Sequence, residues 1–112
     1  MMKKYILILL IYTACSAVFA KPQQYTLESG GGIDDTALGL KDGKGKKFWV
    51  YCQEKCGPWF IYDEQEQHES LSPHYKGRKV IAELSLENNK DRIAGPGEDE
   101  KLYFIKTIKL LK

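Results

Sequence analysis

Apolar and polar side chains alternate from Arg78 to Leu86, which is typical of a strand with one buried face. From Val80 onward the even-numbered positions are apolar, and the odd-numbered positions between them are mostly polar. The segment ENNKDR follows, and its Asn and Asp residues tolerate the left-handed backbone of a tight connection. The pattern therefore predicts a strand that ends in a hairpin turn or loop.

The last apolar segment, Leu102 to Leu111, predicts a long closing strand. Leu102 and Phe104 share a face, but Lys106 interrupts the even-numbered spacing before the next apolar pair. A β-bulge near Lys106 would restore the register. Positions 102, 105, 108 and 112 also have helical spacing, yet the β-branched and aromatic content of the segment favours the strand.

Two shorter strands are predicted in the middle of the chain, Lys47 to Cys52 and Trp59 to Tyr62, separated by a Gly-Pro turn signal. In the first strand, alternation places Trp49 and Tyr51 on the face opposite Val50. Both faces are apolar, so one packs on the core and the other is covered or binds a partner.

The remaining stretches predict less order. Residues 21–46 are expected to be a flexible N-terminal segment with a short strand around Leu38 and Leu40, because ESGGGIDD is rich in glycine and Asp42-Gly43 is a turn signal. Residues 63–70 are polar and acidic, which indicates a solvated loop or one helical turn. The β domain is expected to span residues 47–112.

The first 20 residues have the order of a secretory signal peptide: two lysines, an apolar run and small residues. Cleavage is expected between Ala20 and Lys21. A membrane anchor is the first alternative, but the apolar run is shorter than the roughly 20 residues that span a bilayer. Lipidation at Cys15 is the second, since YTAC resembles a bacterial lipobox, although Tyr12 stands where leucine is usual.

Removal of residues 1–20 lowers the number of Lys and Arg residues from 17 to 15, which equals the number of acidic residues. The mature chain, residues 21–112, is therefore close to neutral. Nucleic acid is excluded as the expected partner, because its binding requires a surplus of positive charge. A chain of this length forms one small domain with a modest core.

Cys52 and Cys56 are the cysteines of the mature chain and should pair in an oxidising compartment. In one extended strand their Cα atoms would lie roughly 13 Å apart, whereas a disulfide needs about 4.4–6.8 Å. The residues between them must therefore fold back as a turn or wide bulge. Thioredoxin-like redox chemistry and a zinc site that recruits His68 and His74 are alternatives, but neither spacing fits.

The segment from Tyr75 to Leu111 resembles the closing part of small exported bacterial OB-fold-like domains. YKGRKV is similar to the Y-x-G-K-x-V pattern that opens a hairpin strand there, and the final apolar strand closes the barrel. The first half matches in strand order rather than in residues, and the Cys-x-x-x-Cys motif lies outside the pattern. The predicted strands, separated by Gly and Pro, already indicate an all-β barrel or sandwich with at most one short helix. With the resemblance and the cysteine pair, the expected fold class is all-β: a small five-stranded OB-like barrel or sandwich with one disulfide. The resemblance implies no ligand.

Candidate catalytic chemistry is sparse. Ser70 or Ser72 with His74 and a carboxylate could be assembled into a hydrolytic set, but no strained turn presents a serine. The acidic clusters lack the spacing of a calcium loop. We therefore expect no catalytic residue, no cofactor and no metal site.

A cluster of aromatic residues is the strongest indication of a binding site, although aromatics dominate cores as well as contact surfaces and a core role is the favoured interpretation of the cluster as a whole. Alternation prevents all of them from facing one interior, so Trp49 or Trp59, with Tyr51, should be partly open. The candidate binding residues are Trp49, Tyr51, Trp59, Phe60 and Tyr62.

These features together predict a non-enzymatic binding module in the periplasm or secreted, whose aromatic face contacts a protein or glycan of the cell envelope. An inhibitor or immunity-type protein is one version, and an OB-like ligand carrier is another. An envelope accessory lipoprotein anchored through Cys15 is the alternative, and only this version would associate with a membrane. A small hydrolase ranks last.

Overall fold

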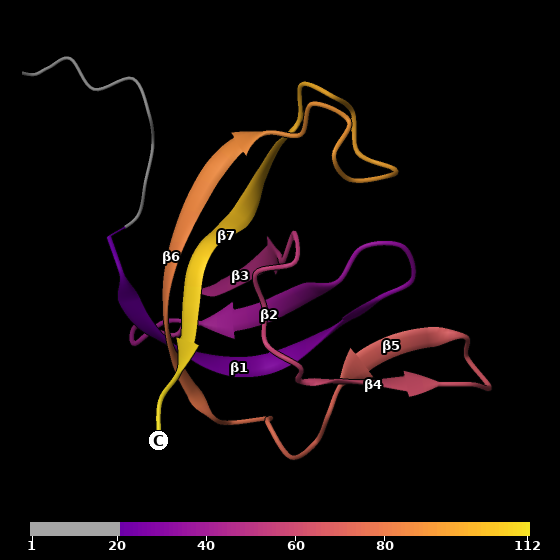
Figure 1. Ribbon diagram of the computed structural model, residues 1–112. Helices are drawn as coiled ribbons and strands as arrows, with labels where there is room; N and C mark the ends of the chain where they lie inside the picture. Colours follow the sequence, from indigo (N-terminus) through magenta and orange to yellow (C-terminus); the bar gives the residue numbers. More distant parts are fainter. Residues whose placement is uncertain (1–20) are drawn as a thin grey trace, which may run out of the picture.

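The computed structural model describes residues 21–112, which form seven strands and no helix. The predicted signal peptide and the lipidation site at Cys15 lie outside the described residues. Within the described part of the chain, no helix has the length and apolarity needed to cross a membrane. The strands are β1 (Gln23–Gly32), β2 (Ala37–Lys41), β3 (Lys47–Tyr51), β4 (Phe60–Asp63), β5 (His68–Leu71), β6 (Lys79–Asn88) and β7 (Lys101–Leu110) (Figure 1).

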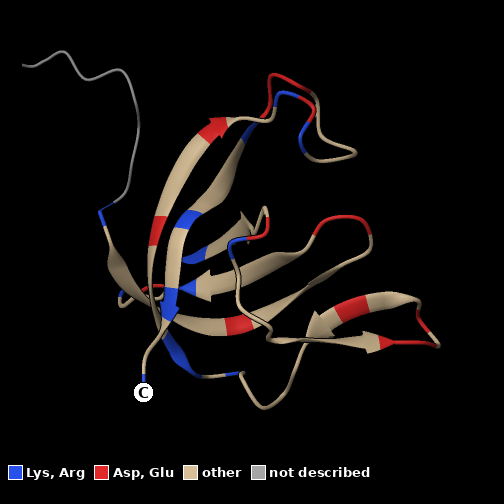
Figure 2. Cartoon of the chain, viewed as in Figure 1, with Lys and Arg blue, Asp and Glu red and all other residues tan. Residues whose placement is uncertain are grey.

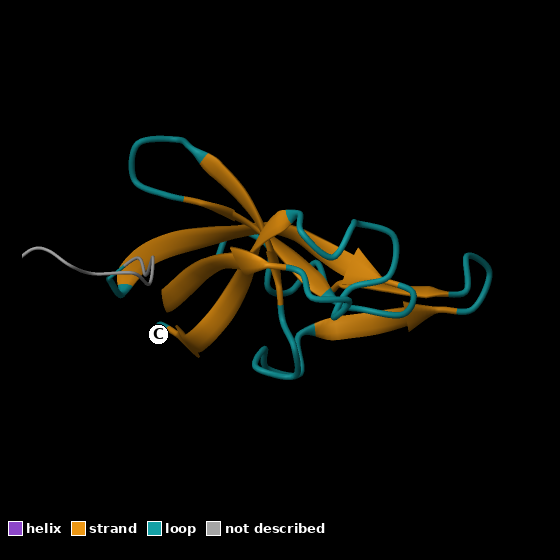
Figure 3. Cartoon of the chain, turned by 90° about the horizontal axis from the view of Figure 1, so that it is seen from above, coloured by secondary structure: helices purple, strands orange, loops and turns teal. Residues whose placement is uncertain are grey.

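Five of the strands close into a barrel in the order β1-β2-β3-β7-β6, and β6 pairs back to β1. The β3–β7 pair is parallel, and the other pairs are antiparallel. Figures 1 and 3 show this barrel as the main body of the molecule. The all-β class is confirmed, and of the two architectures that the sequence left open, the barrel is the one formed.

The barrel interior is filled by the alternating apolar positions of its strands. On β6, Val80, Ala82 and Leu84 are buried, as the alternation predicts. Leu38 and Leu40 of β2 and Val50 of β3 are equally buried. The largest contributions come from the aliphatic and aromatic side chains of the core cluster: Tyr25, Leu27, Leu38, Leu40, Val50, Trp59, Leu71, Val80, Leu84 and Ile105.

The bulge near Lys106 is confirmed. Glu83 pairs with Thr107 and the next residue of β6, Leu84, pairs with Ile105, so Lys106 has no partner in the ladder. The extra residue reverses which positions face inward. Ile105 is therefore buried inside the barrel, and Phe104 lies on the outer face.

The flexibility predicted for residues 21–46 is wrong, because β1 is a barrel strand, whereas the short strand predicted around Leu38 and Leu40 is present as β2. Tyr25 and Leu27 of β1 are buried, and they alternate with more exposed neighbours. The glycines of this segment are typical of a flexible loop, but a Cβ atom on Gly31 would collide with the carbonyl oxygen of Glu69. These glycines therefore allow close strand pairing, which is the other structural use of glycine in a sheet.

Strands β4 and β5 form a hairpin that extends the sheet beyond the barrel (Figures 1 and 3). It joins β1 through two residue pairs, Gly31 with Ser70 and Gly32 with Glu69. The strand predicted at Trp59–Tyr62 is thus β4. The predicted loop over residues 63–70 is partly wrong, because β5 begins at His68.

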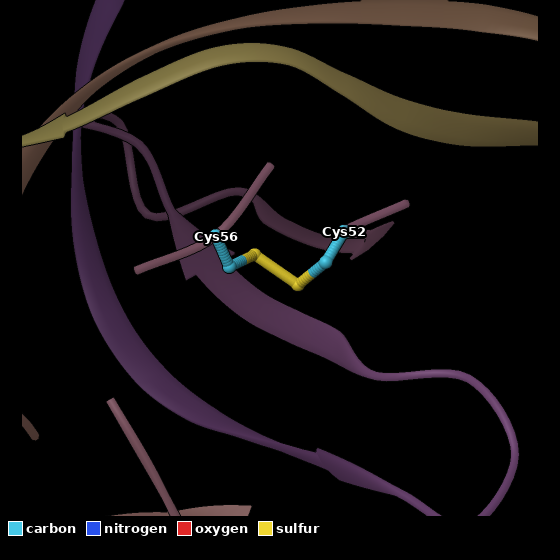
Figure 4. Close-up of a disulfide and its surroundings, with 2 residues drawn as sticks. All are labelled: Cys52 and Cys56. Atoms are coloured by element: carbon cyan, nitrogen blue, oxygen red, sulfur yellow. A yellow bond between two sulfur atoms is a disulfide. The ribbon is translucent and has the colours of Figure 1, made fainter. Parts of the chain in front are cut away.

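The predicted disulfide joins Cys52 and Cys56, whose Cα atoms are 5.3 Å apart (Figure 4). The chain folds back between them as expected: Gln53 and Glu54 have φ values of 47° and 66°. The N–H of Lys55 donates to the carbonyl oxygen of Cys52 at 2.8 Å. The bridge therefore fixes a tight turn directly after β3.

The loop between β6 and β7 packs on the outer face of the barrel and forms a second, smaller core. Phe104 and Ile93 are buried there, although neither belongs to the interior cluster. The guanidinium of Arg92 lies 3.9 Å from the centre of the Phe104 ring. Tyr51 covers the same ring from the side, at 6.1 Å between ring centres.

Asn89 organises this loop from within. Its side chain is fully buried. The amide Nδ2 donates to the carbonyl oxygens of Ile93 and Pro96 at 2.9 and 3.0 Å, and Oδ1 accepts from the N–H of Ile93 at 2.8 Å. Lys90 and Asp91 take the left-handed backbone expected of this segment, with φ of 52° and 62°. A short polar side chain thus replaces regular secondary structure as the support of the loop.

A charged cluster around Glu87 ties the loop to the barrel. Oε1 of Glu87 accepts from Arg92 Nη2 at 3.0 Å, and Oε2 accepts from Lys106 Nζ at 2.9 Å and Ser85 Oγ at 2.6 Å. The hydrogen bond from Lys106, followed by that from Ser85, lowers the pKa of Glu87 from 4.5 to about 2. The bulge residue Lys106 therefore has a role in the electrostatics of the loop.

Removal of the disulfide should destabilise the fold modestly. For a Cys52→Ala, Cys56→Ala variant we expect the free energy of unfolding to fall by about 2 kcal/mol, because so short a loop restricts the unfolded chain only a little. Urea denaturation followed by circular dichroism measures the change. A thiol reductant should shift the wild-type curve towards that of the variant and leave the variant unchanged. Identical midpoints for the oxidised wild type and the variant would contradict the prediction.

Glu87 should contribute an acid-sensitive part of the stability. Its folded-state pKa is lower than its usual value, so the stabilisation is complete above about pH 4.5 and is lost as the pH falls towards 2. Glu87→Gln should lose about 1 kcal/mol at neutral pH and show a weaker dependence on pH in this window. Denaturation curves at several pH values test it. Glu83→Gln, on the same strand but without an ion pair in residues 21–112, is the control that should keep the wild-type pH profile.

Candidate functional site

The five candidate aromatic residues lie in three different places. Trp49 is exposed on the outer face of β3, with 49% of its surface accessible, and Tyr51 is half-buried on the same face. Trp59 is only 6% exposed and belongs to the core. Phe60 is half-buried against the core, and Tyr62 is exposed on the hairpin. The structure therefore does not assemble one surface from all five.

Trp59 is buried because the chain turns inward after the disulfide. Its ring lies 6.2 Å from that of Tyr75, and its edge contacts Gly57, where a Cβ atom would approach the indole to 2.6 Å. Its carbonyl oxygen accepts from the N–H of Ser72 at 2.8 Å. Of the two tryptophans, Trp49 is the one available to a ligand.

Trp49 separates two hollows on the outer face of β1, β2 and β3. The first, about 390 Å³ in volume, is called the Trp49 hollow here. The residues that line it are Gly31, Gly32, Ile33, Asp34, Asp35, Ala37, Trp49, Tyr51, Ile93 and Ala94. The second hollow, about 460 Å³, is lined by Glu28, Ser29, Gly39, Leu40, Lys47, Phe48 and Trp49.

Small residues beside Trp49 keep both hollows open. Gly39 pairs with Trp49 across the β2–β3 ladder, and Ala37 pairs with Tyr51. A Cβ atom on Gly39 would collide with Ser29 Oγ, so the position has no room for a side chain. Cross-strand partners on one face lie within about 4.5–5.5 Å of each other. Ser29 therefore fills the space beside Gly39, and the indole of Trp49 has no bulky side chain as its partner across the β2–β3 ladder.

Two loops form the walls of the Trp49 hollow. Residues 33–36 connect β1 to β2 and place Ile33 at the rim with 79% of its surface exposed. The β6–β7 loop contributes Ile93 and Ala94, and the bonds of Asn89 described above hold this wall in place. Such a wall needs little reorganisation on binding, which reduces the entropic cost.

Carboxylates gather at one side of the Trp49 hollow. Asp34 and Asp35 line it, and they also line an adjoining polar hollow of about 310 Å³ with Thr36, Gln53 and Glu54. Figure 2 shows the acidic colour on the loop between β1 and β2. On the other side of Trp49, Glu28 pairs with Lys41 and Lys47 at 3.3 and 3.8 Å. The local field thus favours ligand hydroxyls, amides or cations over anions near residues 34–35.

The serine and histidine that were considered as a hydrolytic set make other contacts. Ser72 Oγ accepts from the backbone N–H of His74 at 3.2 Å, and the imidazole of His74 packs edge-on against Tyr75. His68 Nδ1 lies 3.0 Å from the carbonyl oxygen of Glu69. Among residues 21–112 no group of three or more His, Cys, Asp or Glu side chains is arranged to hold a metal ion.

Sequence reasoning missed the two isoleucines of the hollow. Ile33 stands in a stretch dominated by glycine and aspartate, and Ile93 in one dominated by polar residues and glycine. The available signal was an isolated large apolar residue in a polar loop, because such a side chain is either buried by the fold or exposed at the surface. The structure shows one of each: Ile93 is covered and Ile33 is presented.

Comparison of the chain with protein-family models, with curated proteins and with solved structures finds no match.

Proposed function

We propose that this protein is an exported, non-enzymatic binding module that contacts a protein or glycan of the cell envelope through the Trp49 hollow. The half-exposed indole of Trp49 on a closed barrel is the observation that carries the proposal. A large apolar ring at a rigid surface position loses water on contact and costs little conformational entropy, which is why tryptophan is enriched at binding hot spots. An inhibitor or immunity-type protein is one version of this function.

The arrangement of the hollow supports the proposal. OB-fold barrels bind ligands over their second and third strands and the loops after the first strand and between the last two. The corresponding parts here are β2, β3, residues 33–36 and the β6–β7 loop, and together they surround Trp49. We therefore retain the OB-like resemblance as part of the proposal.

The residues that line the Trp49 hollow restrict the chemical class of the ligand. The Trp49 hollow combines an indole, the apolar side chains of Ile33 and Ile93 and two carboxylates, which fit a sugar ring or a peptide side chain that offers an apolar face and hydrogen-bond donors. The near-neutral charge of residues 21–112 remains unfavourable to nucleic acid. Export is supported by the residue order of the first 20 positions and is compatible with the disulfide.

Trp49→Ala should weaken partner binding strongly without unfolding the protein. Trp49 is half-exposed, so little core packing is lost, whereas truncation of a hot-spot aromatic typically costs at least about 2 kcal/mol of binding free energy, or roughly thirtyfold in affinity. Binding to purified cell-wall sacculi, measured by co-sedimentation, and to envelope proteins captured on immobilised protein are the two readouts.

Trp49→Phe is the matched control, since it keeps an aromatic ring at the same exposed position of β3 and should retain most of the binding. The two tryptophan indole N–H signals in an NMR spectrum give a second readout, in which a ligand should shift Trp49 and leave the buried Trp59 in place. A folded Trp49→Ala variant that keeps every wild-type partner would refute the proposed site.

The exported protein should begin at Lys21. Intact mass spectrometry of material recovered from the producing cell's envelope or medium should give the mass of residues 21–112 less two hydrogens, because the two cysteines are oxidised. A diacylated chain that starts at Cys15 would instead establish the lipoprotein alternative. Full-length, reduced protein in the cytosol would contradict export altogether.

A further inference from the structure

We propose a second binding surface, the open edge of β4, which takes an extended, positively charged peptide segment of another protein as an added antiparallel strand. This surface lies on the β4–β5 hairpin and is separate from the Trp49 hollow. Strand addition of this kind obtains its affinity from main-chain hydrogen bonds and its specificity from the alternating side chains.

The β4 edge is the open end of the sheet. The strand order ends at β4, whereas β2 pairs with both β1 and β3. The carbonyl oxygen of Trp59 accepts a hydrogen bond from the N–H of Ser72. In an antiparallel pair every second residue forms the hydrogen bonds of the ladder. The backbone groups of Ile61 and Asp63 therefore bond to β5. The N–H and C=O groups of Phe60 and Tyr62 therefore point outward to the open edge. No backbone hydrogen bond outside the strand ladders reaches them from residues 21–112.

At four residues the β4 edge is short and ends in the charged Asp63, but it has no lysine, proline or bulge of the kind that often prevents strand addition. Natural edge strands are protected by lysine, proline or a bulge, and β4 reads Phe-Ile-Tyr-Asp with regular pairing throughout. Ile61 and Tyr62 are 49% and 58% exposed and point to opposite faces of the hairpin. An added strand would therefore find an apolar side chain to pack against on each face.

Charge identifies the occupant. The hairpin, residues 60–71, carries four carboxylates, Asp63, Glu64, Glu66 and Glu69, and no lysine or arginine. None of the four is among the ion pairs of the described chain. Figure 2 shows this acidic concentration at the tip of the hairpin and on β5. A second copy of the chain would bring two such hairpins together, whereas a basic segment would neutralise one.

The base of the hairpin is firm enough to serve as a template. Phe60 packs against the core next to Gly30, where a Cβ atom would lie 3.2 Å from its ring, and Leu71 is buried. At the tip, Asp63 Oδ1 accepts from the N–H groups of Gln65 and Glu66 at 2.9 and 3.2 Å. An isolated two-stranded hairpin is only marginally stable, so these attachments keep β4 extended in the free protein.

The probe for the test is a short, end-blocked peptide of alternating lysine and valine, titrated into the isotope-labelled full domain. We expect saturable shifts of the Phe60 and Tyr62 amide signals and affinity that weakens as salt is raised. The same peptide with glutamate in place of lysine should not bind. Absence of shifts at these amides with millimolar basic peptide would overturn the proposal.

A pair of variants at one position separates the main-chain contact from the side chain. Tyr62→Pro removes an N–H that β5 does not use, so the hairpin ladder is kept while the open edge loses a donor. Tyr62→Ala removes the ring and keeps that donor. We expect the proline variant to bind the peptide about tenfold more weakly than the alanine variant. Equal affinities would show that the peptide does not pair with the edge.

The ligand side supplies the same test if proline disturbs the hairpin, as judged from the β5 amide signals. A probe peptide N-methylated at its valines cannot donate from those positions and should lose binding to the wild type. Glu64→Gln with Glu66→Gln should weaken binding, and Glu98→Gln with Asp99→Asn, which removes two carboxylates from the β6–β7 loop, should not. A concentration-dependent dimer that Tyr62→Pro dissociates would assign the edge to a second copy and overturn the proposal.

Discussion

Strand β1 is the element on which the rest of the structure depends, because it divides its two edges among three other strands. One edge pairs with β2, and the other pairs first with β6 and then with β5. The first two pairings close the barrel, and the third attaches the hairpin. The transition requires Gly31 and Gly32, whose φ values of 150° and 153° and lack of a Cβ atom allow β5 and the following turn to approach the backbone. A strand with side chains at these positions could close the barrel but could not also hold β5 in place.

Small residues at paired strand positions also produce the Trp49 hollow. Val50 must face the interior, so Trp49 and Tyr51 face outward, and their partners across the ladder are Gly39 and Ala37. Tyr51 is then partly covered through Phe104, which the bulge at Lys106 has moved to the outer face. Trp49 has no such cover. The position of the exposed indole therefore follows from strand alternation and from the small residues around it.

Much of the barrel could be predicted from the sequence, because its strands carry their own signals. The alternation from Arg78, the bulge at Lys106 and the outward face of Trp49 and Tyr51 depend on local patterns that the tertiary structure preserves. The second half of β1 could not be predicted, since Gly30 to Gly32 carry no side-chain pattern and are ordered by pairing with β2 and β5. The candidate site was predicted only in part, because some of its residues are placed by long-range contacts. Burial of Trp59 and recruitment of Ile93 are determined by contacts distant in sequence.

The disulfide is a local feature of the sequence that also affects the relative placement of distant strands. Its closed loop is too short to restrict the unfolded chain strongly, so its main effect is on local geometry. Cys52 directly follows β3, which carries Trp49, and Cys56 leads within three residues to the buried Trp59 and then to β4. The turn therefore sets where β4 begins relative to β3. Because the same covalent link follows the strand of the Trp49 hollow and precedes the path to the open edge, the disulfide helps to position both proposed surfaces, even though they use different residues and different chemistry.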